Sequence, residues 1–464
     1  MLVVLASLCL LVVLVPASAD ALTAPTPGAV GAGDPYVPRQ GNGGFDVRHY
    51  DLAVRFDPST DQLQGRVVVR ARSTQALSRF DLDLRKLVVD SVTVDGRAAA
   101  RVARTPGEIV ITPARPVRDH TRFRVVVRYH GNPGNQPRVG NGWFDTRDGA
   151  IVAGEPPSAA FWFPVSEHPS DKATYSMAYT VPSNVRAVSN GIPGPVTTHD
   201  GWTTSHWSLR HPAASYLVTV AIGHWRIHRW RLSSGLPVLT AVDRSLPRHI
   251  DRQLRATRVV IPFLTRMLGP YPFEATGAIV DRHSIGYALE TQTRPVYDSS
   301  FFPRHVDGSY VIAHELAHQW FGDSVALRRW HDIWLNEGFA TWVERAWDAH
   351  RSHGDVAALF HRQYRSIPAG SDFWKLTIGH PGKGRLFADP VYSRGGMTLQ
   401  ALRDRIGAGT FRTLLRTWYR DHRDRWGTTA EFVALAEQVS GTHLAGFFHV
   451  WLDKAGKPAW PQAG

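Results

Sequence analysis

Apolar and polar residues alternate along several short segments in the first half of the chain, and Gly, Pro, Asp and Asn separate these segments. Side chains of a strand point to opposite faces in turn, so this alternation is typical of strands with one buried face. The pattern predicts an all-β domain over residues 45–235. The predicted strand segments are residues 50–56, 65–71, 87–94, 122–129, 175–181 and 216–222.

After about residue 236 the apolar residues recur at intervals of three and four, which is the spacing of one helix face. A chain of 464 residues is also too long for one ordinary core. We therefore predict a multidomain α+β protein in which a mainly α domain over residues 236–464 follows the β domain. The clearer helical segments are residues 252–267, 311–321, 333–349, 396–406, 410–419 and 429–438.

The start of the chain has the composition of an export signal followed by a linker. Residues 2–15 form a run that is apolar except for Ser7 and that small residues follow, which predicts a cleaved signal peptide over residues 1–19. The run is shorter than the roughly 20 residues that span a bilayer. We therefore expect a secreted or otherwise extracytoplasmic protein with no transmembrane segment after cleavage. Residues 20–44 are rich in Pro, Gly, Ala and Thr and predict a flexible linker.

The chain is strongly basic, with a formal net charge of +13. Its Lys and Arg residues are scattered and are not interleaved with aromatic residues in a stripe, so we expect no nucleic-acid partner. Cys9 is the only cysteine and would leave with the signal peptide. The mature chain would therefore form no disulfide of its own. Separately, we expect the protein to be a monomer.

Two histidines and two glutamates have the spacing of a catalytic zinc site. His314 and His318 are four residues apart in the sequence HELAH, so both lie on one face of the predicted helix and reach one metal ion. Glu337 follows after eighteen intervening residues, on the next predicted helix. Two His and one Glu with an open fourth position are typical of catalytic zinc. We predict one zinc ion per chain on these three ligands, with Glu315 left unligated as the general base.

A longer stretch around this motif resembles the zinc aminopeptidase family of gluzincins that includes aminopeptidase N and leukotriene hydrolase. The matching sequences are HELAHQWFGD at 314–323, WLNEGFA at 334–340, FP at 163–164 with KAT at 172–174, and FF at 447–448 with WL at 451–452. The likeness covers about residues 45–460. It implies an N-terminal β-saddle domain joined to a thermolysin-like catalytic domain, in a short form without the family's large helical C-terminal domain.

The resemblance also implies roles for residues outside the metal motif. Glu290 matches the acidic residue of the family's Gly-Ala-Met-Glu-Asn motif and, with Glu155, would hold the free amino group of the substrate. Ala288 of the same segment would contact the peptide. Tyr392 matches the tyrosine that donates a hydrogen bond to the oxyanion. Three positions depart from the motif: Tyr287, Leu289 and Thr291 stand where the family has Gly, Met and Asn.

Together these observations favour a zinc-dependent aminopeptidase that hydrolyses the N-terminal peptide bond of peptides with a free N-terminus. Two alternatives stay open. The first is a secreted zinc endopeptidase of the same fold, in which the altered segment around Glu290 no longer holds the amino group. The second is a basic, envelope-associated binding protein without turnover, which the intact Glu315 and Tyr392 disfavour.

Overall fold

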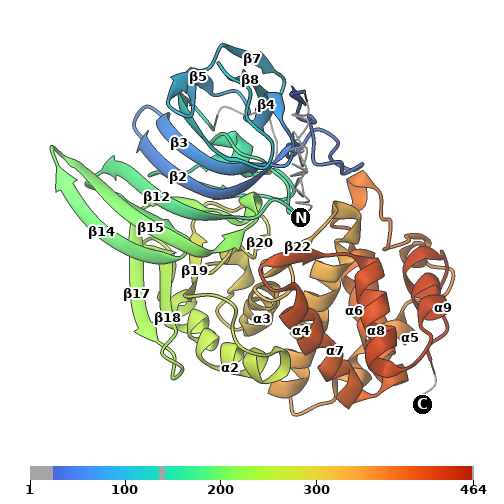
Figure 1. Cartoon of the computed structure of the whole chain (residues 1–464). Helices are drawn as coiled ribbons and strands as arrows, with labels where there is room; N and C mark the ends of the chain where they lie inside the picture. Colours follow the sequence, from blue (N-terminus) through green and yellow to red (C-terminus); the bar gives the residue numbers. More distant parts are fainter. Residues whose placement is uncertain (1–23, 135–141, 462–464) are drawn as a thin grey trace, which may run out of the picture.

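The computed structural model describes residues 24–134 and 142–461, and the predicted signal peptide lies outside these ranges. The described chain forms a sheet-rich part followed by a helical part (Figure 1). Each part has its own cluster of buried apolar residues. The predicted order of an all-β domain followed by a mainly α domain is therefore confirmed. Within the described residues, no helix is both long and apolar enough to cross a bilayer.

The first domain is built on an eight-stranded mixed sheet with the order β14-β15-β12-β2-β3-β9-β5-β6. Alternating burial along β2 follows the alternation of its sequence, so one face of the sheet covers the core. Two four-stranded sheets, β1-β4-β8-β7 and β10-β11-β16-β13, complete the domain. The strands are β1 Thr26–Pro27, β2 Phe45–Asp57, β3 Gln62–Ser73, β4 Leu77–Asp83, β5 Val88–Val94, β6 Arg97–Ala98, β7 Arg101–Thr105, β8 Glu108–Thr112, β9 Arg122–Gly131, β10 Gly142–Asp145, β11 Ala150–Ala153, β12 Ala173–Pro182, β13 Arg186–Ser189, β14 Ile192–His199, β15 Trp202–Ala213 and β16 Val220–Gly223.

The described part of the predicted linker, residues 24–44, is packed against both domains, so the expectation of a flexible segment is wrong there. Thr26 and Pro27 pair with β4. Asp34 is buried and accepts hydrogen bonds from the Trp330 backbone N–H at 2.6 Å and from His168 Nε2 at 3.3 Å. Polar contacts of this kind order a Pro- and Gly-rich segment, and composition alone does not reveal them.

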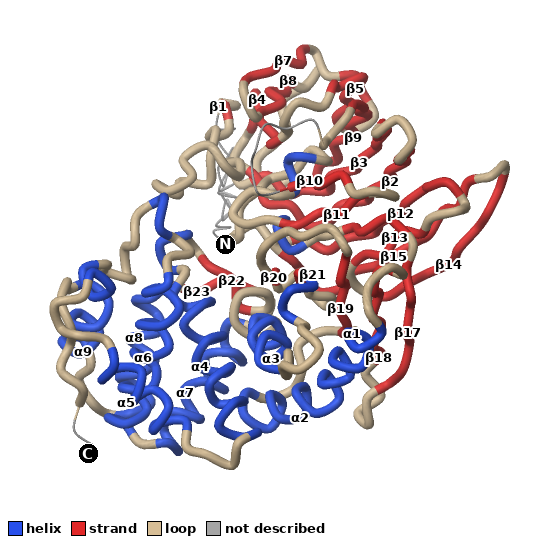
Figure 2. Tube along the Cα trace, turned by 180° about the vertical axis from the view of Figure 1, so that it is seen from behind, coloured by secondary structure: helices blue, strands red, loops and turns tan. Residues whose placement is uncertain are grey.

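The second domain contains a five-stranded sheet with the order β17-β18-β19-β21-β20, beside which the helices pack (Figure 2). This sheet begins at β17, Trp225–Arg231, so the catalytic part starts before the predicted boundary at residue 236. The remaining strands are β18 Pro237–Asp243, β19 Thr276–Asp281, β20 Ala288–Leu289, β21 Val296–Asp298, β22 Val325–Leu327 and β23 Arg425–Gly427. The α-helices are α1 Arg248–Gln253, α2 Thr257–Leu268, α3 Ser309–His318, α4 Trp334–Arg351, α5 Val356–Ser366, α6 Asp389–Ile406, α7 Ala408–His422, α8 Thr429–Ser440 and α9 Ala445–Phe448.

Two glycines bring helices α4 and α6 unusually close together. A Cβ atom on Gly338 would lie 2.9 Å from the carbonyl carbon of Gly395, and a Cβ atom on Gly395 would lie 2.8 Å from the Cα atom of Gly338. Backbone atoms cannot yield at such distances, so both positions exclude any side chain. This close crossing places Tyr392, one turn before Gly395 on α6, beside the face of α4 that carries Glu337.

Candidate active site

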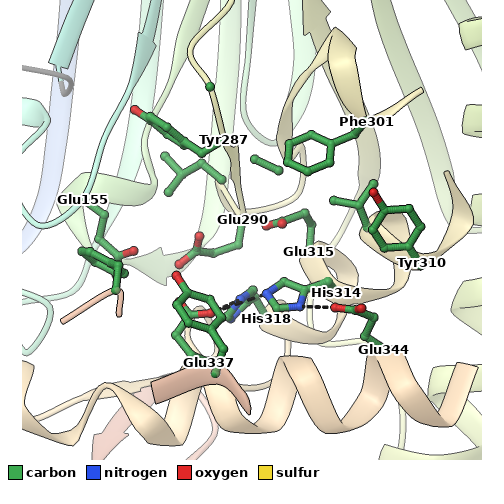
Figure 3. A pocket seen from close by; sticks show the side chains of 16 residues that line it. Glu155, Tyr287, Glu290, Phe301, Tyr310, His314, Glu315, His318, Glu337 and Glu344 are labelled. Carbon is green, nitrogen blue, oxygen red and sulfur yellow. Dashed lines mark hydrogen bonds and ion pairs between the residues drawn. The ribbon is translucent and has the colours of Figure 1, made fainter. Parts of the chain in front are cut away.

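Helices α3 and α4 bring three potential metal ligands together. The Oε2 atom of Glu337 lies 3.5 Å from His314 Nε2 and 3.5 Å from His318 Nε2. One ligand atom from each of the three residues lies within 4.8 Å of the others. The carboxylate and the two imidazoles therefore converge on one point from two helices (Figure 3). Nitrogen and oxygen donors in this number fit a zinc ion and leave a coordination position open.

The other nitrogen of each imidazole already has a protein partner. His314 Nδ1 donates to Glu344 Oε2 at 3.0 Å, and His318 Nδ1 donates to the Phe321 carbonyl at 3.1 Å. These bonds select the tautomer whose Nε2 atom carries a free lone pair. Partners of this kind orient the ligands of metal sites. The two Nε2 atoms are thus prepared to bind a cation.

The charges at this cluster are arranged around the ligand carboxylate. Burial would raise the pKa of Glu337, but the His318 and His314 imidazoles lower it below its usual value. In return, the Glu337 charge outweighs the effect of burial on His318 and raises the pKa of that imidazole to about 9. A negative carboxylate is thus stabilised by positive charge at this point. A divalent cation would supply that charge in place of the protons.

Glu315 lies on the metal-facing helix but does not belong to the group of three donors. Its side chain is buried, and burial raises the pKa of its carboxyl to about 8 while His314 and His318 oppose the shift. A carboxylate whose pKa is raised in this way is a stronger base than an exposed glutamate. The arrangement suits proton transfer at neutral pH.

A second acidic group lies across the cavity from helix α4. Glu290 follows β20, is buried, and accepts a hydrogen bond from the Tyr216 hydroxyl at 3.2 Å. Burial raises the pKa of Glu155, and the charge of Glu290 raises it further. A buried carboxyl group whose pKa is raised by the charge of a second carboxylate favours the binding of a cation such as an ammonium.

Tyr392 approaches the cluster from α6. Its ring stacks on the His314 ring with centroids 6.2 Å apart. Burial and the Glu337 charge raise the pKa of the Tyr392 hydroxyl well above its usual value, so the group stays protonated and is a hydrogen-bond donor.

All of these groups line one cavity of about 420 Å³. The eight site residues predicted from the sequence all contribute to its wall, including Ala288 on β20. Five of the ten glutamates of the chain line the cavity: the four predicted ones and Glu344. The rest of the wall is mostly apolar or aromatic, and no Lys or Arg belongs to the part of it that the structure describes. The other lining residues are Gly286, Tyr287, Leu289, Phe301, Tyr310, Val311, Glu344 and Phe387.

Sequence reasoning missed three residues that contact the predicted site residues. Glu344 holds His314, Tyr216 donates to Glu290, and Gln319 donates to the backbone carbonyl of Glu290 at 2.8 Å. Glu344 is seven residues after Glu337, which places both on one face of a helix, so this spacing could have revealed it. Gln319 lies within the matching sequence HELAHQWFGD, to which only the metal ligands and Glu315 were assigned roles, and nothing local in the sequence marks Tyr216.

The sequence matches models for two domains of one peptidase family. The Peptidase M1 N-terminal domain matches residues 47–217, and the Peptidase family M1 domain matches residues 296–451. Together with the donor set, these matches define a two-domain zinc metallopeptidase fold. The chain belongs to peptidase family M1.

Named relatives have related sequences, and solved structures have the same architecture. Glutamyl aminopeptidase of Bitis rhinoceros is 27% identical over 329 residues, which is 66% of this chain and 34% of the relative. Aminopeptidase M1-D of Oryza sativa subsp. japonica is 26% identical over 449 residues, which is 89% of this chain and 50% of the relative. The chain thus spans half or less of the length of these two proteins. A crystal structure of a variant of the M1 zinc metallopeptidase from Deinococcus radiodurans is 27% identical, has a TM-score of 0.85 and covers 93% of this chain and 100% of its own.

A further structure of the Deinococcus radiodurans protein holds a Tyr-Ser-Ala substrate, with a TM-score of 0.83 and coverage of 94% of this chain and 100% of its own. The family and these zinc metallopeptidases agree with the donor set found here. The cofactor of this chain is therefore zinc.

Proposed function

We propose that this protein is a zinc-dependent aminopeptidase that removes the first residue from peptides with a free N-terminus. The observation that carries the proposal is the closeness of two sites. Ligand atoms of Glu290, Glu315 and His318 lie within 4.8 Å of one another, so an acidic group for an ammonium lies directly beside the metal donors. A substrate held there by its amino terminus has only its first peptide bond within reach.

In this proposal His314, His318 and Glu337 hold the zinc ion. When bound, zinc supplies a Lewis acid that lowers the pKa of water and polarises a carbonyl group. Glu344 keeps the His314 ring in place through its bond to Nδ1.

Glu315 acts as the general base and then as the general acid. Its carboxylate takes a proton from the attacking water and passes that proton to the nitrogen of the departing amine. Burial favours this exchange because it raises the carboxyl pKa toward neutrality. One positioned group thus serves both proton transfers.

Tyr392 stabilises the charge that develops on the carbonyl oxygen. Its hydroxyl stays protonated and able to donate at neutral pH, because burial and the Glu337 charge hold its pKa well above the usual value. A donor placed for the charged oxygen lowers the barrier, since that charge exists only during the reaction.

Glu290 and Glu155 bind the ammonium of the substrate. Hydrogen bonds to charged groups contribute about 1.5–3 kcal/mol each. Two such bonds would disfavour a blocked N-terminus by several orders of magnitude. This difference separates the proposal from the endopeptidase alternative.

The proposed aminopeptidase activity is tested with three substrates and one variant. Wild-type protein is assayed on an aminoacyl reporter, on a free tripeptide and on the N-acetylated tripeptide, before and after chelation and zinc restoration. We expect zinc-dependent release of the first residue and no cleavage of the acetylated peptide. Glu315→Gln should keep one zinc per chain and lose about 10²–10⁴-fold in kcat. Internal cleavage of the acetylated peptide at the rate of the free one would contradict the aminopeptidase assignment.

We further propose that the protein is exported and monomeric. The apolar run at residues 2–15 and the small residues after it support export. The test for export is whether the N-terminus of the protein recovered outside the cytoplasm begins at residue 20. The test for the monomer is its mass in solution by light scattering.

A further inference from the structure

Gln319 connects the metal-binding helix to the segment that carries Glu290. It follows His318 directly and is fully buried. Its Nε2 atom donates to the Glu290 carbonyl oxygen at 2.8 Å, and its Oε1 atom accepts from the Thr293 backbone N–H at 2.7 Å. The Tyr271 hydroxyl also donates to Oε1, at 3.3 Å. One side chain therefore fixes both ends of the turn from Glu290 to Thr293.

Thr293 has a backbone conformation that costs energy. Its φ angle is +69°, a left-handed value that β-branched residues rarely adopt. Thr293 is also fully buried, and its hydroxyl oxygen accepts a hydrogen bond from the Gly191 backbone N–H at 2.7 Å. Glycine would adopt this φ angle without strain but would lack the hydroxyl. The strained residue is held by one bond to the metal helix and another to the N-terminal domain.

The N-terminal domain holds the same turn at two further points. Asn190 Nδ2 donates to the Gln292 carbonyl at 2.7 Å and to the Leu217 carbonyl at 2.9 Å. The buried guanidinium of Arg294 donates to the carbonyls of Ser189 and Gly191. Residues 290–294, which follow β20, are thus hydrogen-bonded to the metal-binding helix on one side and to residues 189–191 on the other.

We propose that Gln319 and Thr293 are positioning residues that set the distance between the amine-binding carboxylate of Glu290 and the zinc site. This inference rests on the proposed aminopeptidase function. Gln319 bonds to the backbone of Glu290 itself and stands next to a metal ligand in the chain, so any shift at Gln319 moves one site relative to the other. A displacement of about 1 Å between reacting groups can cost about 10²-fold in rate. Neither residue lines the cavity, so both act through Glu290.

The first test replaces Gln319 with methionine, which has a similar length and neither donor nor acceptor of comparable strength. The matched control is Gln400→Met. Gln400 is equally buried, accepts from Trp342 Nε1 at 3.0 Å and donates to Asp404 at 2.7 Å, away from the cavity. For Gln319→Met we expect KM for a free-amine aminoacyl reporter to rise by about 10-fold or more, with zinc still at one per chain. For Gln400→Met we expect KM to equal that of wild type.

A second pair of variants tests the same inference at Thr293 if Gln319→Met does not fold. Thr293→Ser keeps the hydroxyl oxygen that Gly191 binds, whereas Thr293→Val keeps the shape and removes it. We expect KM to rise about 3–10-fold in the valine variant and to stay at the wild-type value in the serine variant. If Thr293 had only a structural role, both variants would have a lower melting temperature, and KM would not change independently of kcat.

Two results would overturn the inference. One is a folded Gln319→Met protein with one zinc and an unchanged KM. The other is an equal KM for the valine and serine variants at Thr293. Both differ from a failure of the proposed function, in which wild-type protein with zinc would cleave no aminoacyl reporter at all.

Discussion

Lys172 of the N-terminal domain donates from its ammonium group to the backbone carbonyl of Asp323, at 2.6 Å. The same Nζ atom also reaches the Ser324 carbonyl at 2.8 Å. Asp323 lies just beyond the metal-binding helix, and its backbone N–H donates to the His318 carbonyl at 2.9 Å. A cation of the first domain thus binds carbonyl groups of the turn that follows the metal-binding helix.

Replacing Lys172 by methionine should destabilise the protein. The buried carbonyls of Asp323 and Ser324 would lose their charged donor, and the methionine thioether cannot donate a hydrogen bond. We expect the free energy of unfolding to fall by about 2–4 kcal/mol. Denaturant unfolding measures this value. Lys375→Met is the control, because Lys375 is 74% exposed and its loss should change stability by no more than about 0.5 kcal/mol. Equal effects of the two variants would contradict the role of Lys172.

Glu344 should determine how tightly zinc is bound. Its carboxylate accepts from His314 Nδ1, and the loss of such a partner typically weakens metal affinity by about 10–100-fold. We therefore expect Glu344→Ala to raise the zinc Kd by that factor, as measured by competition with a chelator. Asp348→Ala removes a carboxylate four residues further along the same helix that pairs with Arg345, so its zinc Kd should match that of wild type. An unchanged Kd in the Glu344 variant would show that the bond to His314 is dispensable.

Several strands and helices of this structure could be predicted from the spacing of apolar residues along the sequence. Alternation predicted β2 and β9, and the three- and four-residue spacing predicted the helix that carries His314 and His318. Glu337 lies on a separate helix, yet the amphipathic spacing of that helix was visible as well. These elements form because each has one apolar face, a property that neighbouring residues in the sequence determine.

The missed features depend on contacts between distant segments. Strands β18 and β19 are buried on both faces, so their sequences do not alternate, and no strand was predicted there. The packing of residues 24–44 depends on Asp34 meeting Trp330. The role of Gln319 depends on the positive φ angle of Thr293, which no sequence pattern signals.

Asp171 should make stability depend on pH. The group is partly buried, accepts from the Val47 backbone N–H at 3.1 Å, and has its pKa raised from 3.8 to about 7, first by burial and then by Asp46. Between pH 3.8 and about 7 the folded state therefore binds more protons than the unfolded state, so this contribution to stability is lost as the pH rises. Asp171→Asn should remove that loss and stabilise the protein by about 1–2 kcal/mol at pH 8 relative to wild type.

Melting temperatures of both proteins from pH 5 to 8 measure this difference. The wild-type and Asp171→Asn curves should approach each other toward pH 5 and separate toward pH 8. Parallel curves would contradict the raised pKa of Asp171.

The charge of the cavity should exclude acidic first residues. Five glutamates line it, and no Lys or Arg belongs to its described wall. A substrate carboxylate placed there would lose its hydration without gaining a cationic partner, which costs about 2 kcal/mol or more. We therefore expect kcat/KM for a glutamyl reporter to be about 30-fold or more below that for a leucyl reporter.

The control is a glutaminyl reporter, which has the same shape and no charge. Its kcat/KM should be much closer to the leucyl value. Higher salt should narrow the glutamyl difference, because part of the repulsion is screened. The result would distinguish this chain from its relative named glutamyl aminopeptidase, and equal rates on the glutamyl and glutaminyl reporters would refute the electrostatic argument.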